Sequence, residues 1–197
     1  MAFQEIAHGK YLIKFGPRGQ LSQAKAFIND RQVGQTFVAD SEDEALSDLR
    51  AYLDGREGQI AAGRSADGAP SAIEYAEAFD RLGKLPAGYE AMLEAHLNAP
   101  DCCITATQLA EAAGYENYNA ANLHYGTLGQ MIAEEIGYNP PRRKTDGSTI
   151  WTGALAVPAN LQGEEDTDWQ SLYARGDEGH FLWRLRPQVV EALAGEK

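Results

Sequence analysis

The chain has 197 residues, of which 44% are hydrophobic, so it can bury one good core or two small ones without help from metals or disulfides. No run approaches the roughly 18 to 20 apolar residues of a membrane span, and the first residues lack the basic and apolar regions of a signal peptide, so we expect a soluble, cytoplasmic protein without membrane partners. The net charge of −12 argues against avid nonspecific DNA binding, because such binders usually carry a basic face.

Residues 10 to 40 have the apolar alternation and turn signals of three short strands. Tyr11, Ile13 and Phe15 alternate with other side chains, and Gly-Pro-Arg-Gly and Asn-Asp sequences separate the predicted strands. Ser41, with Glu44 three residues later, then predicts a capped helix with an apolar stripe. The sequence therefore predicts a small β-β-β-α domain over residues 1–56.

A stretch rich in glycine, alanine, serine and proline follows, and it predicts a linker over residues 57–70. Beyond it, Ser71 with Glu74 predicts a capped helix, and a second helix follows Pro86. These helices open a second domain over residues 71–197.

Residues 105 to 138 predict two helices joined by a tight turn. Thr105 and Gln108 form a capping-box pattern, Gly114 suits the end of the first helix, and Asn119 is the expected cap of the second. These helices can close against the preceding helix to form a helix-turn-helix core, through Met92, Leu93, Leu109, Ala110, Ala113, Leu123, Leu128, Ile132 and Ile136.

Two strands are predicted after the helices, at residues 148–157 and 180–186, and Pro187 then starts a closing helix. Trp151 and Trp183 lie on these strands, which should pair, and we expect both in the core; the alternative is a stacking platform for bases. The connection over residues 158–179 is long and acidic. Helices followed by a hairpin are typical of a winged helix, so the expected fold class is α+β, with a winged-helix-like C-terminal domain that carries an acidic wing loop.

The run ITATQLAEAAGYENYNAANLHYGTLGQMIAEEIGY, followed by IWTGALA and WRLRPQVVEAL, resembles a winged-helix-like module of uncharacterised bacterial proteins. That module is sometimes found beside HNH-type nuclease segments in restriction-like proteins. The similarity covers about residues 86–194, and it implies a context in DNA transactions or defence. No HNH segment is present in this chain, so the resemblance assigns no catalytic residue.

Uncharged polar side chains on the second helix suit base readout, since amides can pair with adenine and tyrosines can touch thymine methyls or stack on bases. The alternative is that these side chains only cap, pack or solvate the turn. Phosphate contacts must come from basic residues elsewhere, which could equally balance an acidic surface. The candidate nucleic-acid-binding residues are Asn117, Tyr118, Asn122, His124, Tyr125, Arg142, Arg143, Lys144, Arg184 and Arg186.

The acidic connection offers a different surface, because clustered carboxylates can bind a basic protein and keep it from DNA. Its candidate partner-binding residues are Glu164, Glu165, Asp166 and Asp168. The segment lacks the ligand spacing and central glycine of an EF-hand, so we expect no metal there. The adjacent Cys102 and Cys103 cannot form a Cys-x-x-Cys knuckle and are expected to be reduced thiols.

Catalytic motifs are absent from the sequence, and the four histidines are scattered singly, so we expect no enzymatic activity and no cofactor. The favoured function is a non-enzymatic DNA-associated regulatory or defence module that binds DNA weakly, as a monomer or a homodimer. The alternative is an acidic protein-interaction module, such as an adaptor or a DNA mimic that inhibits a DNA-handling enzyme.

Overall fold

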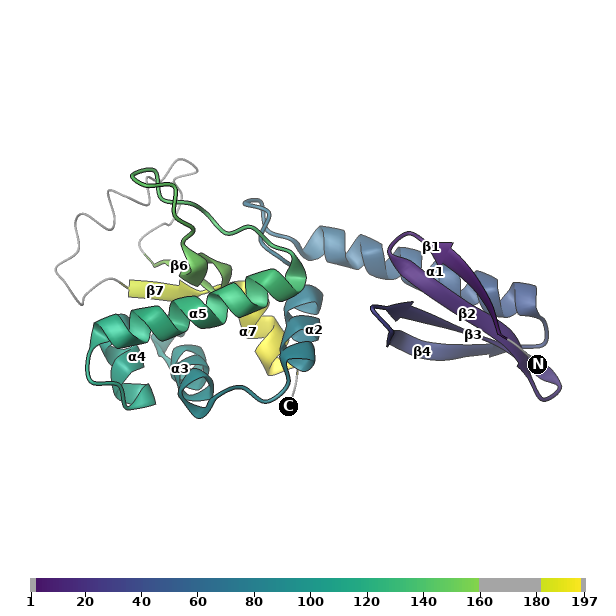
Figure 1. Cartoon of the computed structure of the whole chain (residues 1–197), viewed down its shortest axis with the longest axis horizontal. Coiled ribbons are helices and arrows are strands. Elements are labelled where there is room, and N and C mark those ends of the chain that lie inside the picture. Colours follow the sequence, from purple (N-terminus) through teal and green to yellow (C-terminus); the bar gives the residue numbers. More distant parts are fainter. Residues whose placement is uncertain (1–2, 160–181, 196–197) are drawn as a thin grey trace. The chain divides into compact units, whose positions relative to one another are not determined.

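The computed structural model describes residues 3–159 and 182–195 (Figure 1). The protein is of the α+β class and divides into two compact units, Met1–Ala61 and Ala62–Lys197. Among the described helices, none combines the length and apolar character needed to cross a membrane.

The first unit is an antiparallel meander of four strands with one helix on a face of the sheet (Figure 1). The strands are β1 (Gln4–His8), β2 (Tyr11–Arg18), β3 (Leu21–Ile28) and β4 (Arg31–Ala39), in that order across the sheet. The buried side chains of β2 and β3 pack on those of α1 (Glu42–Gly63), namely Tyr11, Ile13, Ala24, Ala26, Ala45, Leu46, Leu49 and Leu53. The prediction of three strands was therefore one short, because β1 is almost wholly exposed and has no apolar alternation to reveal it.

Helix α1 is longer than the sequence predicts. It continues to Gly63, although a linker was expected from residue 57. The reason is that Arg56 and Ile60 are buried and extend the helical stripe of Leu49 and Leu53 by two more turns. The Arg56 guanidinium donates a hydrogen bond to the Tyr11 hydroxyl, so a charged side chain occupies a buried position of this otherwise apolar stripe.

The second unit has a helical core and a small sheet. Its helices are α2 (Ala72–Leu82), α3 (Ala87–Asn98), α4 (Ala106–Ala113), α5 (Tyr118–Ile136) and α7 (Pro187–Ala194). Its antiparallel strands are β5 (Cys103–Thr105), β6 (Ala156–Pro158) and β7 (Leu182–Leu185), in the order β5-β7-β6. Short 3-10 turns, η1 (Pro100–Cys102) and η2 (Trp151–Ala154), precede β5 and β6.

Most of the predicted strand over residues 148–157 is wrong, since only Ala156 and Val157 of that range lie in β6. Trp151 instead starts η2, which packs on α5 where Gly129 leaves room for its backbone. Trp151 is half-buried, and Trp183 is buried between Ile104 and Pro158 in the sheet, so the two tryptophans are not strand partners.

Candidate nucleic-acid interface

Helices α4 and α5 form a tightly capped pair. Thr105 accepts a hydrogen bond from the Gln108 backbone N–H, and the Gln108 side chain accepts one from the Thr105 N–H, which confirms the predicted capping box. Gly114 closes α4 with a φ of 70°. The cap of α5 is Asn117, whose side chain accepts from the Ala120 N–H, rather than the predicted Asn119.

One face of α5 packs in the core. Ala121, Tyr125, Leu128 and Ile132 are buried at spacings of four, three and four residues, with α4 packed beside them. This spacing fixes the rotation of the helix about its axis, so the opposite face must point away from the core.

The opposite face carries an uncharged row, which we call the α5 stripe: Asn119, Asn122, Leu123, Gly126 and Gln130. These residues follow the i, i+3, i+4, i+7 pattern of a single helix face. Leu123 is 68% exposed, so the prediction that it belongs to the core is wrong. A Cβ at Gly126 would meet only the Thr152 hydroxyl, at 3.9 Å, so the middle of the α5 stripe admits close approach by a ligand.

Three of the predicted contact residues of α5 lie outside the α5 stripe and are buried or half-buried. Tyr125 is buried, and its hydroxyl lies 2.6 Å from His96 Nδ1, so it cannot touch nucleic acid as predicted. Burial also raises the pKa of Tyr125. His124 is half-buried and stacks on the Tyr115 ring, with 4.6 Å between ring centroids. Tyr118 is half-buried at the start of α5.

The predicted basic cluster lies on an exposed turn. Residues 142–149, which we call the basic turn, are closed by a hydrogen bond from the Arg143 N–H to the Ser148 carbonyl and by a bridge between Arg142 and Thr149. Arg142, Arg143 and Lys144 are all exposed. Exposed basic side chains on a turn are of the type that contacts phosphates in protein–DNA complexes.

Arg184 and Arg186 differ, although both were predicted to contact phosphate. Arg184 is half-buried on β7 and its Nε donates to Cys103 Sγ at 3.4 Å. Arg186 is 3% exposed, so its predicted role is wrong. It donates to the Gly153 carbonyl and pairs with Asp67, at 2.9 Å in each case, and thereby ties β7 to the start of the unit.

The acidic residues Glu164, Glu165, Asp166 and Asp168 lie outside the described residues. Their predicted role in binding a protein partner therefore stays a prediction.

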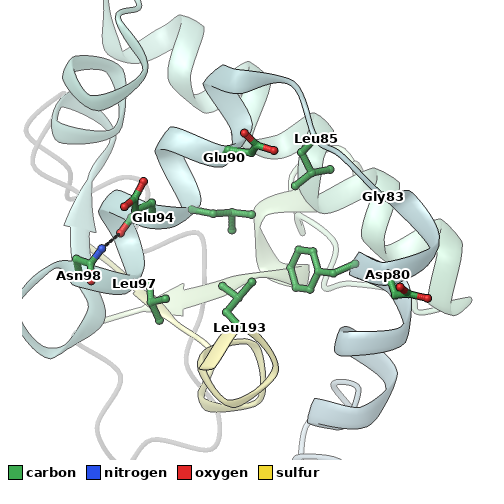
Figure 2. A pocket seen from close by; sticks show the side chains of 10 residues that line it. Asp80, Gly83, Leu85, Glu90, Glu94, Leu97, Asn98 and Leu193 are labelled. Carbon is green, nitrogen blue, oxygen red and sulfur yellow. Dashed lines mark hydrogen bonds between the residues drawn. The ribbon is translucent and has the colours of Figure 1, made fainter. Parts of the chain in front are cut away.

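A groove that the sequence did not suggest lies between α2, α3 and α7, with a volume of about 510 Å³. Figure 2 shows Glu90 and Glu94 along α3, Asp80 from α2 and Leu193 from α7 around it. Its apolar floor is formed by Phe79, Leu85, Leu93, Leu97 and Leu193. None of its lining residues belongs to α4 or α5, so it is a separate surface from the α5 stripe.

The rim of this groove is acidic. Glu90 and Glu94 lie one turn apart on α3, and Asp80 of α2 also belongs to the lining of the groove. No basic side chain lines the groove, and no described residue forms an ion pair with these three carboxylates. Sequence reasoning missed the groove because its residues come from three helices, although the acidic spacing on α3 was a visible signal.

Comparison with protein-family models, curated proteins and solved structures found no match to this chain. The similarity of residues 86–194 to a winged-helix-like module therefore stays a prediction. In the described part of the second unit, the α5 stripe and the basic turn carry residue types that suit contacts with nucleic acid.

Proposed function

We propose that the second unit is a winged-helix-like, DNA-associated module without enzymatic activity, and that the α5 stripe enters a groove of duplex DNA. The order α3, β5, α4, α5, β6, β7 supports this proposal, because a winged helix places a helix-turn-helix between the first and second strands of a small sheet. In that arrangement α5 is the recognition helix.

The observation that carries the proposal is the α5 stripe, which lies on the face of α5 opposite the core. Asn119 and Asn122 are exposed, and an asparagine amide can donate to and accept from the edge of adenine. Leu123 between them can contact a thymine methyl, and Gly126 allows the helix backbone to approach the bases. The surface thus has groups for base edges and almost none for phosphates.

The scarcity of phosphate contacts predicts weak binding with a shallow salt dependence. Arg142, Arg143, Lys144 and Arg184 are the four cations that the proposal assigns to phosphates. Four contacts give a slope of log K against log salt of roughly −3.6, well below that of strongly electrostatic DNA binders.

The test uses a labelled duplex, selected from a random pool by binding to the full chain, in fluorescence anisotropy titrations. The double variant Asn119→Ala/Asn122→Ala should weaken binding by about tenfold or more, because each lost bidentate contact is worth about 1–3 kcal/mol. Glu111→Gln, on the exposed side of α4, is the control and should bind as the unchanged chain does. Unchanged affinity of the double variant, or failure of the pool to yield any duplex bound at 100 µM (about the weak limit of nonspecific binding), would refute the proposal.

A second candidate function rests on the groove between α2, α3 and α7. An apolar floor beneath a row of carboxylates is complementary to an amphipathic helix with leucines on one side and lysines or arginines at its borders. The row from Glu90 to Asn98 spans roughly 12 Å along α3, which matches about two turns of a partner helix. This is the surface through which the chain would act as a protein-interaction module.

Charge reversal at the rim tests this second function. Glu90→Lys/Glu94→Lys should reduce binding of a helical Leu/Lys peptide by at least tenfold, and a Leu/Glu peptide of the same pattern should not bind the unchanged chain. Glu111→Lys/Glu116→Lys makes the same charge change on exposed residues away from the groove and serves as the control. Equal loss in both double variants would show that only net charge matters, which contradicts a specific groove.

A further inference from the structure

One face of the sheet in the first unit is not covered by α1. On β2 and β3, the side chains that alternate with the buried Ile13, Ala24 and Ala26 lie on the other face, because neighbouring residues of a strand point to opposite sides. This face, which we call the open sheet face, carries Leu12, Lys14, Arg18, Leu21, Gln23, Lys25 and Phe27, with Glu5 and Val38 on the strands beside them and Phe3 just before β1.

The centre of the open sheet face is positively charged. Lys14 and Lys25 stand directly opposite each other on neighbouring strands, an arrangement that costs stability because like charges repel. Lys14 Nζ lies 3.0 Å from Glu5 Oε1, whereas Lys25 has no ion pair within the described part of the chain. In a chain of net charge −12, this pair is a place where an anion would relieve repulsion.

Apolar and aromatic side chains flank the two lysines. Phe27 lies two residues beyond Lys25 on the same face, with Lys14 Nζ 5.4 Å from its ring centroid. On the other side, Phe3 lies against Gly16 and is 48% exposed. Aromatic rings beside lysines on an open sheet are suited to unpaired bases, which stack on the rings while the phosphates meet the cations.

We propose that the open sheet face binds single-stranded nucleic acid, with phosphates at Lys14, Lys25 and Arg18 and bases stacked on Phe27 and Phe3. This function goes beyond the one proposed for the second unit and does not depend on it. It concerns another unit, another set of residues and an unpaired strand. Duplex DNA fits the face less well, because its bases are already stacked on each other and cannot reach the rings.

The test measures binding of the full chain to labelled dT12 by fluorescence anisotropy at low salt. Lys25→Glu should reduce the affinity for dT12 at least tenfold. The variant also replaces the repelling lysine pair by a pair of opposite charges, so the thermal midpoint of unfolding should not fall. Phe27→Leu keeps an apolar side chain but removes the ring, and it should reduce affinity by about tenfold. Arg50→Glu, on α1 and thus away from the open sheet face, makes the same charge change as a control.

Several results would overturn this proposal. They are no binding of dT12, an unchanged affinity in Lys25→Glu, or an equal loss in Arg50→Glu. Binding to vesicles with 30 mol% phosphatidylserine but not to dT12 would assign the face to anionic membranes instead. Asn119→Ala/Asn122→Ala should leave dT12 binding intact, so failure of the duplex proposal and failure of this one are distinguishable.

Discussion

Gly129→Ala is expected to lower the free energy of unfolding of the second unit by about 3 kcal/mol, at the upper end of the usual cost of overpacking a core. A Cβ at this position would lie 2.2 Å from the Trp151 carbonyl oxygen and 2.9 Å from its carbonyl carbon. These are backbone atoms of η2, so no side-chain rotation can relieve the clash. Either α5 or η2 must move, and the contact between them holds the base of the α5 stripe in place.

Gly126→Ala is the matched control, one turn earlier on the same helix. Its added methyl group meets only the Thr152 hydroxyl, at 3.9 Å, so the variant should be more stable by about 0.5–1 kcal/mol through helix propensity. Urea unfolding followed by tryptophan fluorescence measures both, because all three tryptophans of the chain lie after residue 150 and thus report on the second unit. Similar stabilities for the two variants would show that η2 does not pack as tightly as the structure has it.

Local signals in the sequence predicted where several helices begin. The capping boxes at Ser71 and Thr105 are both present, and α7 begins at Pro187 as expected. A cap depends on residues within three or four positions of one another, so its chemistry is complete in a short stretch of sequence. The same reasoning failed only by two positions at α5, where Asn117 and Asn119 are both suitable caps.

Burial was harder to predict, because it depends on which way an element faces. Leu123 was assigned to the core by its apolar character, yet it lies two residues from both Ala121 and Tyr125 and therefore about 160° away from each on a helix. Tyr125 was assigned to the contact surface because a tyrosine ring suits thymine methyls and bases, yet the ring is buried and its hydroxyl contacts the buried His96. A stricter use of helical spacing would have corrected both.

Long-range pairs could not be predicted from sequence at all. Arg186 pairs with Asp67, which is 119 positions away, and nothing in either segment indicates the other. Asn122 and Arg142 are exposed, as residue type alone suggests, while their contact with nucleic acid stays a prediction. The groove between α2, α3 and α7 could not be identified in this way, because it forms only when three helices pack together.

The two proposed nucleic-acid surfaces share one property, a shortage of positive charge. Each has few cations, and the chain as a whole is acidic. Each proposal therefore expects weak binding by its own surface, and each is tested on its own ligand, a duplex for the α5 stripe and dT12 for the open sheet face.

The second unit is expected to lose about 3 kcal/mol of stability between pH 7 and pH 4 through His96 alone. His96 is fully buried, with Nδ1 2.6 Å from the Tyr125 hydroxyl and Nε2 3.1 Å from the Trp183 carbonyl oxygen. The carbonyl can only accept, so Nε2 carries the hydrogen and Nδ1 accepts from Tyr125. Burial lowers the pKa of His96 to about 4, and backbone hydrogen bonds with Trp183 and Cys102, which raise the pKa, offset this effect only in part.

The direction of the effect follows from proton uptake. An unfolded histidine has a pKa of about 6.5, so between pH 6.5 and 4 the unfolded chain binds a proton that the folded chain does not. The free energy of unfolding contributed by His96 is therefore complete above pH 6.5 and declines as the pH falls to about 4. Burial raises the pKa of Asp67, but hydrogen bonds, above all from Arg186, outweigh burial and hold it below its usual value, so the stability it contributes is lost at lower pH still.

His96→Gln isolates this contribution, since its amide can donate to the Trp183 carbonyl and accept from Tyr125 but does not titrate. Urea unfolding of both proteins at pH 7, 6, 5 and 4.5, again by tryptophan fluorescence, should show a shallower loss in the variant. The stability difference between the two proteins should narrow steadily across this range, because the carboxylates are common to both. Parallel curves would mean that His96 is protonated inside the folded unit, and the Nδ1 contact with Tyr125 would then have to run in the opposite direction.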